Sequence, residues 1–165
     1  METQELVQNR ETQPVVHSTF EIERSFPKSP KIVFVAFVDP SKMKRRFAEG
    51  RHHEVEEFNQ DFRLGGELRL RYRFKEGTPF PGVAITNVGH YHEIVPDRRI
   101  VISQTMDLGE KRIAASLVTV EFVEDGQGTR LTCTHQGAFF EGADGPKMRE
   151  AGWNTLLDKL VTEVA

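Results

Sequence analysis

The sequence predicts an α+β fold in which a curved antiparallel sheet is closed by a long C-terminal helix. Apolar and charged residues alternate along Glu67 to Phe74, which indicates a strand with one face suited to a core. The pair Gly65-Gly66 directly before this strand supplies backbone freedom for a tight turn. Near the other end, Gly152-Trp153 lies in an apolar helical segment and contains the only tryptophan. Such a helix needs a sheet to lie on, so we expect the two to pack together.

The length of 165 residues favours one domain that is large enough to form its own core. Residues 1–16 are polar and show no sustained period, so we expect a loosely attached arm before a single domain over residues 17–165. The only cysteine, Cys133, cannot form an intrachain disulfide, and the first residues lack the apolar stretch of a signal peptide. Together these features predict a cytoplasmic protein.

Charge and hydropathy argue against two classes of partner. With 22 basic and 25 acidic residues, the formal net charge of −3 gives no general attraction for nucleic acid or an anionic membrane. The longest apolar run, Ile32 to Val38, is well short of the roughly 20 residues that a membrane-spanning helix requires. We therefore expect neither nucleic acid nor membrane as a partner, and a homodimer is left open.

A strand and two short helices are predicted at the start of the domain. Phe20 and Ile22 alternate with polar residues and indicate a strand that begins near His17. Ser29 is the expected N-cap of the first helix, and Ser41 is the expected N-cap of the second.

The middle of the chain predicts a meander of antiparallel strands. Its apolar residues have a period of mostly two, and short turns separate the segments, whereas parallel strands would need crossovers of about a dozen residues. The candidate strands are His52 to Phe58, Glu67 to Phe74, Val83 to Ile94, Ile100 to Met106, Ile113 to Val123 and Thr129 to Gln136. With the first strand, they give a sheet of about seven strands.

The last segment predicts a long amphipathic helix with Asp144 as its N-cap. Its apolar stripe is expected to face the sheet, because apolar residues recur at helical spacing. The expected stripe is Met148, Gly152, Leu156, Leu160 and Val164, with Trp153, Leu157 and Val161 beside it.

This order of elements resembles the helix-grip fold of the START-like, or SRPBCC, superfamily, which includes polyketide cyclases. Several motifs also resemble the family homologous to the C-terminal domain of the activator of the heat-shock protein 90 ATPase. They are Val33-Phe34 with Asp39-Pro40, Asp61-Phe62-Arg63-Leu64-Gly65-Gly66, Gly89-His90-Tyr91-His92-Glu93-Ile94 with Pro96, Gly128-Thr129-Arg130-Leu131-Thr132, and Gly152-Trp153 with Leu156 and Leu160. The resemblance covers about residues 18 to 164 and implies a cavity between the sheet and the C-terminal helix.

One segment departs from that family. The family often has a tryptophan near the start of the second short helix, where this chain reads Lys44-Arg45-Arg46-Phe47. We expect Phe47 to fill part of the missing volume.

Aromatic side chains are the candidates for the cavity wall, because small-molecule pockets are mostly apolar with a few polar tips. His135 shares a strand face with Leu131 and Cys133, so its imidazole is expected to reach the cavity if Leu131 points inward. Packing in the core is the alternative role for each candidate. The residues expected to bind a ligand are Tyr72, Phe74, Tyr91, His135, Phe139 and Trp153.

Signals for catalysis and metal binding are poor. His52-His53 and the pair His90 and His92 suggest a metal site, but no further ligand stands at a typical spacing. The sequence contains neither a G-x-S-x-G nucleophile motif nor a phosphate-binding loop. We therefore expect no catalytic residue, no metal ion and no cofactor.

The polar face of the Glu67 to Phe74 strand carries three arginines. They either dock an acidic partner or form ion pairs with glutamates of other strands, and we expect the paired face. The arginines are Arg69, Arg71 and Arg73, and the candidate partners are Glu54, Glu56 and Glu121.

Three functions remain open at this point. The first is a domain that binds a small apolar or amphipathic molecule in its cavity without catalysis. The second is a co-chaperone-like domain that contacts heat-shock protein 90 in the stress response, as the family resemblance implies. The third is an enzyme of the cyclase or dehydratase kind, with Tyr72, Tyr91 and His135 as acid or base candidates.

Overall fold

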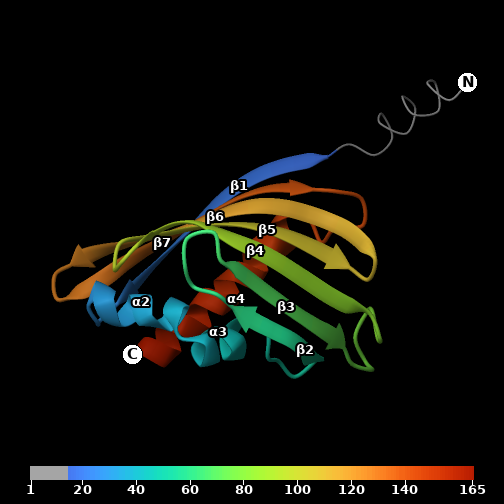
Figure 1. Cartoon of the computed structure of the whole chain (residues 1–165), viewed down its shortest axis with the longest axis horizontal. Helices are drawn as coiled ribbons and strands as arrows, with labels where there is room; N and C mark the ends of the chain where they lie inside the picture. Colours follow the sequence, from blue (N-terminus) through green and yellow to red (C-terminus); the bar gives the residue numbers. More distant parts are fainter. Residues whose placement is uncertain (1–14) are drawn as a thin grey trace, which may run out of the picture.

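The computed structural model describes residues 15–165 as one antiparallel sheet with three helices (Figure 1). The sheet has seven strands in the order β1-β7-β6-β5-β4-β3-β2. The strands are β1 Val16–Phe26, β2 His53–Gln60, β3 Glu67–Phe74, β4 Ala84–Val95, β5 Arg99–Leu108, β6 Lys111–Asp125 and β7 Gly128–Phe139. The helices are α2 Pro30–Val38, α3 Pro40–Phe47 and α4 Pro146–Val164. The predicted α+β helix-grip fold is confirmed, including the two short helices after the first strand.

Strands β2 to β7 form the predicted meander, and each pairs with its neighbour in an antiparallel register. The first strand joins the far edge of the sheet, where Phe20 lies opposite His135 of β7. Figure 1 shows the sheet arched over α4, with α2 and α3 beside that helix. The predicted arm over residues 1–16 falls almost entirely outside the described residues, so that division of the chain stays a prediction.

The motif Asp61 to Gly66 folds into a tight turn that is bound to β4. A Cβ atom at Gly66 would overlap the carbonyl oxygen of Asp61, so the turn requires glycine at this position. The amide of Gly65 donates to the carbonyl of Tyr91 at 2.8 Å, and the amide of Tyr91 donates to the carbonyl of Gly66 at 3.1 Å. The turn therefore fixes the backbone of Tyr91 in the middle of β4.

The first short helix has the predicted N-cap residue, and the second has a different one. Ser29 is the N-cap residue of α2, but its side chain makes no capping hydrogen bond. Asp39, rather than Ser41, caps α3, because its carboxylate accepts from the backbone amides of Ser41 at 2.9 Å and Lys42 at 3.3 Å. A carboxylate accepts both hydrogen bonds, and its negative charge is attracted by the positive end of the helix dipole.

The long helix α4 buries only part of the predicted stripe, with Leu160 and Val164 from the stripe and Trp153 and Leu157 from beside it. Met148 is 67% exposed, and Gly152 is also exposed. The residue at the N-cap position is Gly145, not Asp144. The buried residues of α4 are Arg149, Trp153, Leu157, Leu160 and Val164.

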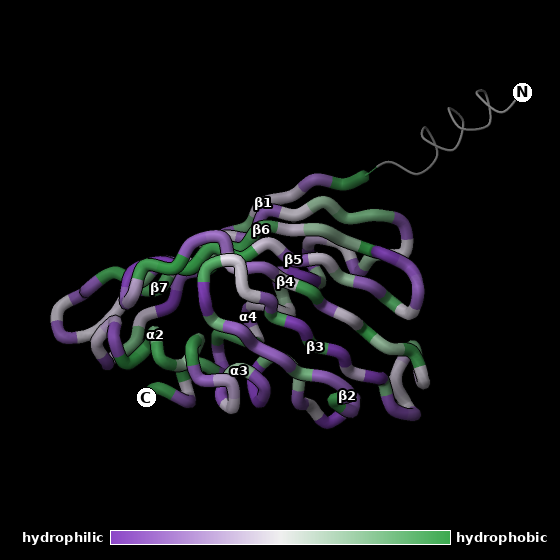
Figure 2. The backbone as a smooth tube through the Cα atoms, in the orientation of Figure 1, coloured by the Kyte–Doolittle hydropathy of each residue, from purple (hydrophilic) through white to green (hydrophobic). Residues whose placement is uncertain are grey.

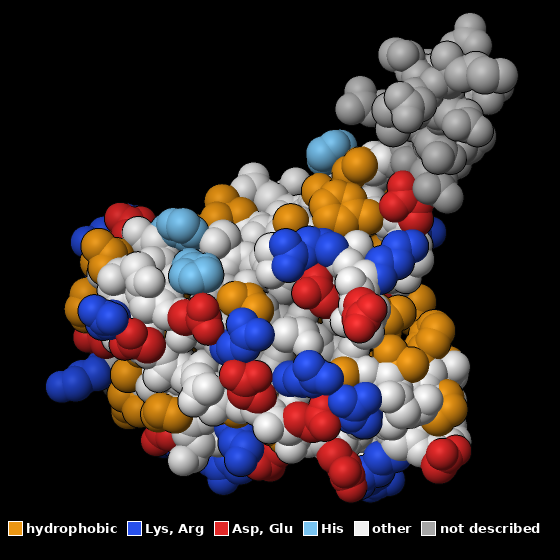
Figure 3. Space-filling model, turned by 45° about the vertical axis from the view of Figure 1, so that its right-hand side comes forward, with side chains coloured by type: hydrophobic (Ala, Val, Ile, Leu, Met, Phe, Trp, Pro, Cys, Tyr) orange, Lys and Arg blue, Asp and Glu red, His pale blue; other side chains and the backbone are white. Residues whose placement is uncertain are grey.

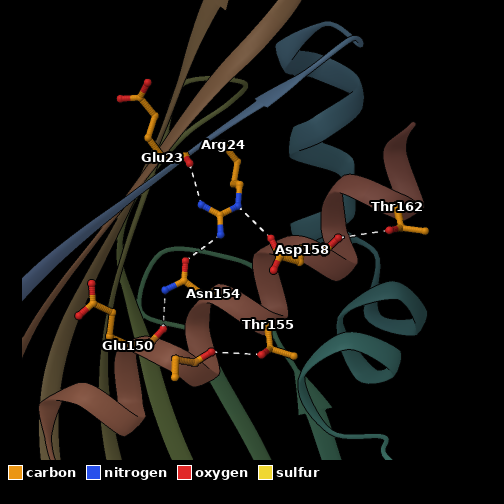
Figure 4. Close-up of polar contacts among 8 residues, drawn as sticks. Glu23, Arg24, Glu150, Asn154, Thr155, Asp158 and Thr162 are labelled. Carbon is orange, nitrogen blue, oxygen red and sulfur yellow. Dashed lines mark hydrogen bonds and ion pairs between the residues drawn. The ribbon is translucent and has the colours of Figure 1, made fainter.

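Helix α4 is attached at its outer side to β1 (Figure 4). Arg24 of β1 donates to Asn154 at 2.7 Å and to the carboxylate of Asp158 at 3.1 Å. At its C-terminal end, α4 is joined to α3 by an ion pair of 3.0 Å between Arg46 and Glu163. Polar contacts thus fix the middle and the end of α4.

Hydrophilic and hydrophobic residues alternate along the strands of the sheet (Figure 2). Because successive side chains of a strand point to opposite faces, the alternation separates the two kinds between the faces. On the outer surface, charges of both signs are intermixed (Figure 3). Arg71 and Arg73 both pair with Glu56, and Arg69 pairs with Glu57 at 3.2 Å. The predicted ion-paired outer face is confirmed, with Glu57 in place of Glu54 and Glu121.

None of the helices within residues 15–165 is long and apolar enough to cross a membrane.

Candidate functional site

A small cavity lies where the concave face of the sheet meets the three helices. Its volume is about 30 Å³, which is room for about one water molecule. The helices contribute Phe37, Met43, Phe47 and Trp153, and Phe62 comes from the turn before β3. The strands contribute Leu68, Tyr91, Ile100, Ile102, Gln104, Val118 and Val120. The wall is almost entirely apolar, and no charged side chain lines it.

Glycine in β4 helps to shape this wall. Gly89 lies opposite Leu68 of β3 and Gln104 of β5 on the sheet. A Cβ atom at Gly89 would stand 2.8 Å from Cδ1 of Ile102, which is closer than side chains pack. The glycine of the Gly89-His90-Tyr91 motif therefore lets the cavity-lining side chain of Ile102 lie flat against β4.

Tyr91 is held in the cavity wall by a hydrogen bond and by aromatic packing. Its hydroxyl accepts a hydrogen bond of 3.0 Å from Nε2 of Gln60, which also donates to the carbonyl of Phe37 at 2.8 Å. The ring of Phe62 packs edge-on against it with centroids 4.9 Å apart. Burial raises the pKa of Tyr91 to about 12, so its hydroxyl stays protonated at neutral pH.

Trp153 lies between the cavity and a second group of buried side chains. Its ring packs edge-on against Phe47 with centroids 5.6 Å apart, and its centroid lies 6.2 Å from that of His135. Phe47, which we expected to fill part of the volume of the missing family tryptophan, thus lies in the cavity wall next to Trp153. His135 in turn stacks on Phe20 at 4.6 Å and on Phe139 at 6.1 Å.

His135 is buried with 0% exposure, and neither of its ring nitrogens has a hydrogen-bond partner among the described residues. Burial first, and the nearby charge of Arg149 second, lower the pKa of His135 to about 4. The imidazole is therefore neutral at pH 7, with one nitrogen donor and one acceptor unused.

Arg149 lies beside His135 and carries its own counter-ion. It donates from Nε to Asp144 at 2.8 Å and from Nη2 to the same carboxylate at 2.6 Å. Its guanidinium lies 5.1 Å from the centroid of the Phe139 ring, and its Nη2 is 3.1 Å from the sulfur of Met106. His135, Arg149, Asp144 and Phe139 form what we call the polar cluster.

The structure divides the six predicted binding residues among three places. Tyr91 and Trp153 line the cavity, and His135 and Phe139 belong to the polar cluster behind Trp153. Tyr72 and Phe74 pack with His53, whose ring centroid is 4.1 Å from that of Tyr72. Burial raises the pKa of Tyr72 and lowers that of His53. A binding role for the six residues stays a prediction.

The prediction from sequence missed several residues at this site. Phe62 stands inside the Asp61 to Gly66 motif, which we interpreted only as a turn. Arg149 precedes Trp153 by one helical turn and continues toward the N-terminus the buried stripe of Trp153, Leu157 and Leu160. Helical spacing from the tryptophan was the signal that could have placed Arg149 inside.

The arrangement offers little for acid and base catalysis at neutral pH. Efficient proton transfer needs a pKa near the working pH, whereas that of Tyr91 is about 12 and that of His135 about 4. No group of three His, Cys, Asp or Glu residues within the described part of the chain is placed to hold a metal ion. His92 hydrogen-bonds Ser103 at 2.7 Å, and His53 hydrogen-bonds the carbonyl of Ala48 at 2.6 Å.

Comparisons with known proteins agree with this fold. A model of the family described as "Activator of Hsp90 ATPase homolog 1-like protein" matches residues 27–165. The crystal structure of the Mll3558 protein from Rhizobium loti is 45% identical, with a TM-score of 0.80 over 90% of this chain and 98% of that one. An uncharacterized protein from Rhizobium leguminosarum is 32% identical, with a TM-score of 0.82 over 91% of this chain and 95% of that one.

A more distant structure shares the fold alone. The AHSA1-like protein from Aeromonas hydrophila, solved in solution, is 19% identical, with a TM-score of 0.62 over 88% of this chain and 90% of that one. Among curated protein sequences, none matches this chain.

Proposed function

The chain belongs to the family of Activator of Hsp90 ATPase homolog 1-like proteins, and we propose that it binds a small apolar or amphipathic molecule between its sheet and its helices. The observation that supports this proposal is the cavity, whose lining comes from three helices and four strands without a charged side chain. Small-molecule sites are typically concave and apolar with few polar groups. Here those groups are Gln104 and the hydroxyl of Tyr91.

The cavity must enlarge to accept such a molecule, because about 30 Å³ holds about one water molecule. Met43 and Phe47 lie on the short helix α3, and methionine adapts readily to new neighbours. Phe47 and Phe62 are only partly buried. Movement of these side chains opens the cavity toward α3 without any change in the sheet.

Native mass spectrometry of the purified protein and titration with apolar ligands test the proposal. Binding should shift the fluorescence of Trp153, the only indole, and raise the melting temperature. A ligand present at 100 times its Kd stabilises by about 2.7 kcal/mol. If a panel of apolar ligands at about 100 μM changes neither signal, no site of micromolar affinity exists and the proposal fails.

A matched pair of variants on β6 locates the site. Val118 lines the cavity, and Val123 is 46% exposed on the same strand. Val118→Phe should fill the cavity and abolish binding, whereas Val123→Phe should bind as the wild type does. If Val118→Phe does not melt cooperatively, Val118→Leu replaces it in the test, because leucine enlarges the side chain less.

The family description supports a second candidate, an interaction with heat-shock protein 90. On this chain, Ile32 and Val35 leave apolar surface of α2 exposed at 51% and 43%. The test is a sedimentation or pull-down measurement with purified heat-shock protein 90. Replacement of both residues by Ser should abolish any complex. If the variant still forms the complex, α2 is not the contact surface.

We also propose a cytoplasmic setting. Cys133 is a free, buried cysteine, and burial raises the pKa of its thiol to about 12. Such a thiol resists oxidation, and a chain without disulfides suits a reducing compartment. Localisation of a tagged chain by cell fractionation tests this point.

A further inference from the structure

The polar cluster contains a buried imidazole, that of His135, which does not stabilise the fold through hydrogen bonds. His135 is 0% exposed, and both its ring nitrogens lack partners among residues 15–165. Buried polar groups in proteins are nearly always hydrogen-bonded, because an unpaired one costs stability. An apolar residue of similar shape would pack between Phe20 and Phe139 without that cost. The imidazole therefore indicates a partner that the protein itself does not supply.

The second unusual group is the ion pair of Arg149 with Asp144. The Arg149 side chain is 10% exposed and that of Asp144 is 26% exposed, so water reaches the acid more readily. Asp144 lies in a loop with positive φ angles at Gly142 and Gly145, of 77° and 88°. Arg149 is fixed on the buried face of α4 and against Phe139, whereas Asp144 is placed by a loop with glycine hinges.

We propose that the carboxylate of an amphipathic ligand replaces Asp144 at Arg149 and accepts a further hydrogen bond from His135, while the apolar body of the ligand occupies the cavity beyond Trp153. This assignment rests on the proposed function, because it names the chemical class that the cavity accepts. Asp144 is then the resident counter-ion, which holds the place of the ligand carboxylate in the free protein.

The exchange keeps the charge of the interior balanced. The guanidinium of Arg149 is a cation, so leaving it without an anion in the interior would be costly. One carboxylate substitutes for another, and the released Asp144 regains water at the surface while the ligand carboxylate loses it. The net affinity then comes from the apolar body of the ligand and from the bond to His135.

A monoanionic carboxylate fits this cluster better than a phosphate does. A single guanidinium offers a planar fork that matches two carboxylate oxygens, and the anion that it now binds, Asp144, is itself a carboxylate. The cavity itself has no charged side chain, so a charged head group must lie outside it. The other buried arginine, Arg46, is paired with Glu163 at the opposite end of α4.

The experiment compares decanoic acid with decan-1-ol, which share an apolar chain and differ in charge. Titration of Trp153 fluorescence at about pH 7.5, where the acid is ionised, gives both affinities. The wild type should bind the acid about tenfold more tightly or better than the alcohol. Arg149→Met should remove this preference, and Asp144→Asn should strengthen acid binding by about tenfold, because the competing carboxylate is gone.

Asp158→Asn is the matched control, because Asp158, like Asp144, is an aspartate paired with an arginine, but it lies on α4 at the outer side of the helix (Figure 4). It should leave both affinities unchanged. His135→Phe should weaken acid binding and not alcohol binding. If Arg149→Met does not melt cooperatively, Asp144→Asn and His135→Phe still carry the test.

Two results overturn the inference in distinguishable ways. If acid and alcohol bind equally and Asp144→Asn has no effect, the carboxylate site is wrong and the apolar cavity stands. If neither probe binds, both the carboxylate site and the proposed function fail.

Discussion

The ion pair between Arg46 and Glu163 joins α3 to the end of α4, and Glu163→Ala tests what it contributes. The Arg46 side chain is fully buried and that of Glu163 is 29% exposed, with the two groups 3.0 Å apart. The guanidinium also lies 5.0 Å from the ring of Phe37 and 5.1 Å from that of Phe47. Burial lowers the pKa of Arg46, and the carboxylate of Glu163 raises it in part. The variant therefore leaves a buried cation without its anion.

Breaking a buried pair from one side costs about 3–5 kcal/mol, and the partial exposure of Glu163 screens the charge, so we expect about 2 kcal/mol. For a domain of this size, that loss lowers the melting temperature by about 4–8 °C. The double variant Arg46→Met with Glu163→Ala removes both charges and keeps apolar contact with Phe37 and Phe47. It should lose less stability than the two single variants added together, with a coupling of about 1 kcal/mol.

Urea unfolding of the four proteins measures this cycle, and Asp158→Ala is the control. Asp158 pairs with Arg24 in an exposed position, with side chains 68% and 26% accessible. Exposed pairs contribute less than about 1 kcal/mol, so this variant should stay close to the wild type. If Glu163→Ala loses no more stability than Asp158→Ala, or if the cycle shows no coupling, the burial argument for Arg46 is wrong.

Three further predictions concern the stability of the fold. Burial holds the pKa of His135 at about 4, so the unfolded chain takes up the proton first, and stability should fall by about 3 kcal/mol as the pH drops from about 6.5 to 4. His135→Phe should remove this loss, which urea unfolding at pH 7 and pH 4 measures; an unchanged pH dependence would contradict it. Gly66→Ala should destabilise the protein by about 2 kcal/mol or more, because its Cβ atom would meet the carbonyl of Asp61; an equal melting temperature would refute the strained turn. Truncation before Asp144 removes α4 and should give insoluble or molten protein, whereas a soluble product that melts cooperatively would contradict the packing of α4 on the sheet.

The strands were predictable because apolar residues at every second position directly indicate that one face of the strand is buried. The prediction for Glu67 to Phe74 coincides with β3, and the other meander strands differ from prediction by a few residues at their ends. Strand ends depend on backbone hydrogen bonds with the neighbouring strand, which a single segment does not encode. The position of β1 beside β7 was likewise not predicted, because only the assembled sheet determines it.

Helix faces and caps were less predictable, since several residues can serve the same local purpose. Asp39 and Ser41 are both good cap residues, and the side chain of Asp39 caps α3. The predicted stripe of α4 included Met148 and Gly152, which are exposed, and left out Arg149, which is buried. Arg149 is buried with a partner from the preceding loop, and such a pair is invisible in the periodicity of apolar residues.

The candidate site was predictable only in part. Tyr91 and Trp153 were expected at the cavity and line it. Its other walls come from Phe37, Met43 and Phe47 on the short helices, whose contacts with the sheet depend on the tertiary arrangement of α2 and α3. A cavity is a property of several elements at once, so no local pattern predicts it.

The strand order carries a consequence for how the chain folds. Strand β1 is synthesised first among the strands, but it pairs with β7, which is synthesised last. Thr129 of β7 donates to the carbonyl of Lys28 from a position 101 residues further along the chain. Closing so long a loop is slow, so β1 must wait unpaired while the meander forms. An unpaired strand can associate with the edge of another molecule, and β1 is therefore the segment through which we expect nascent copies of this chain to misassemble.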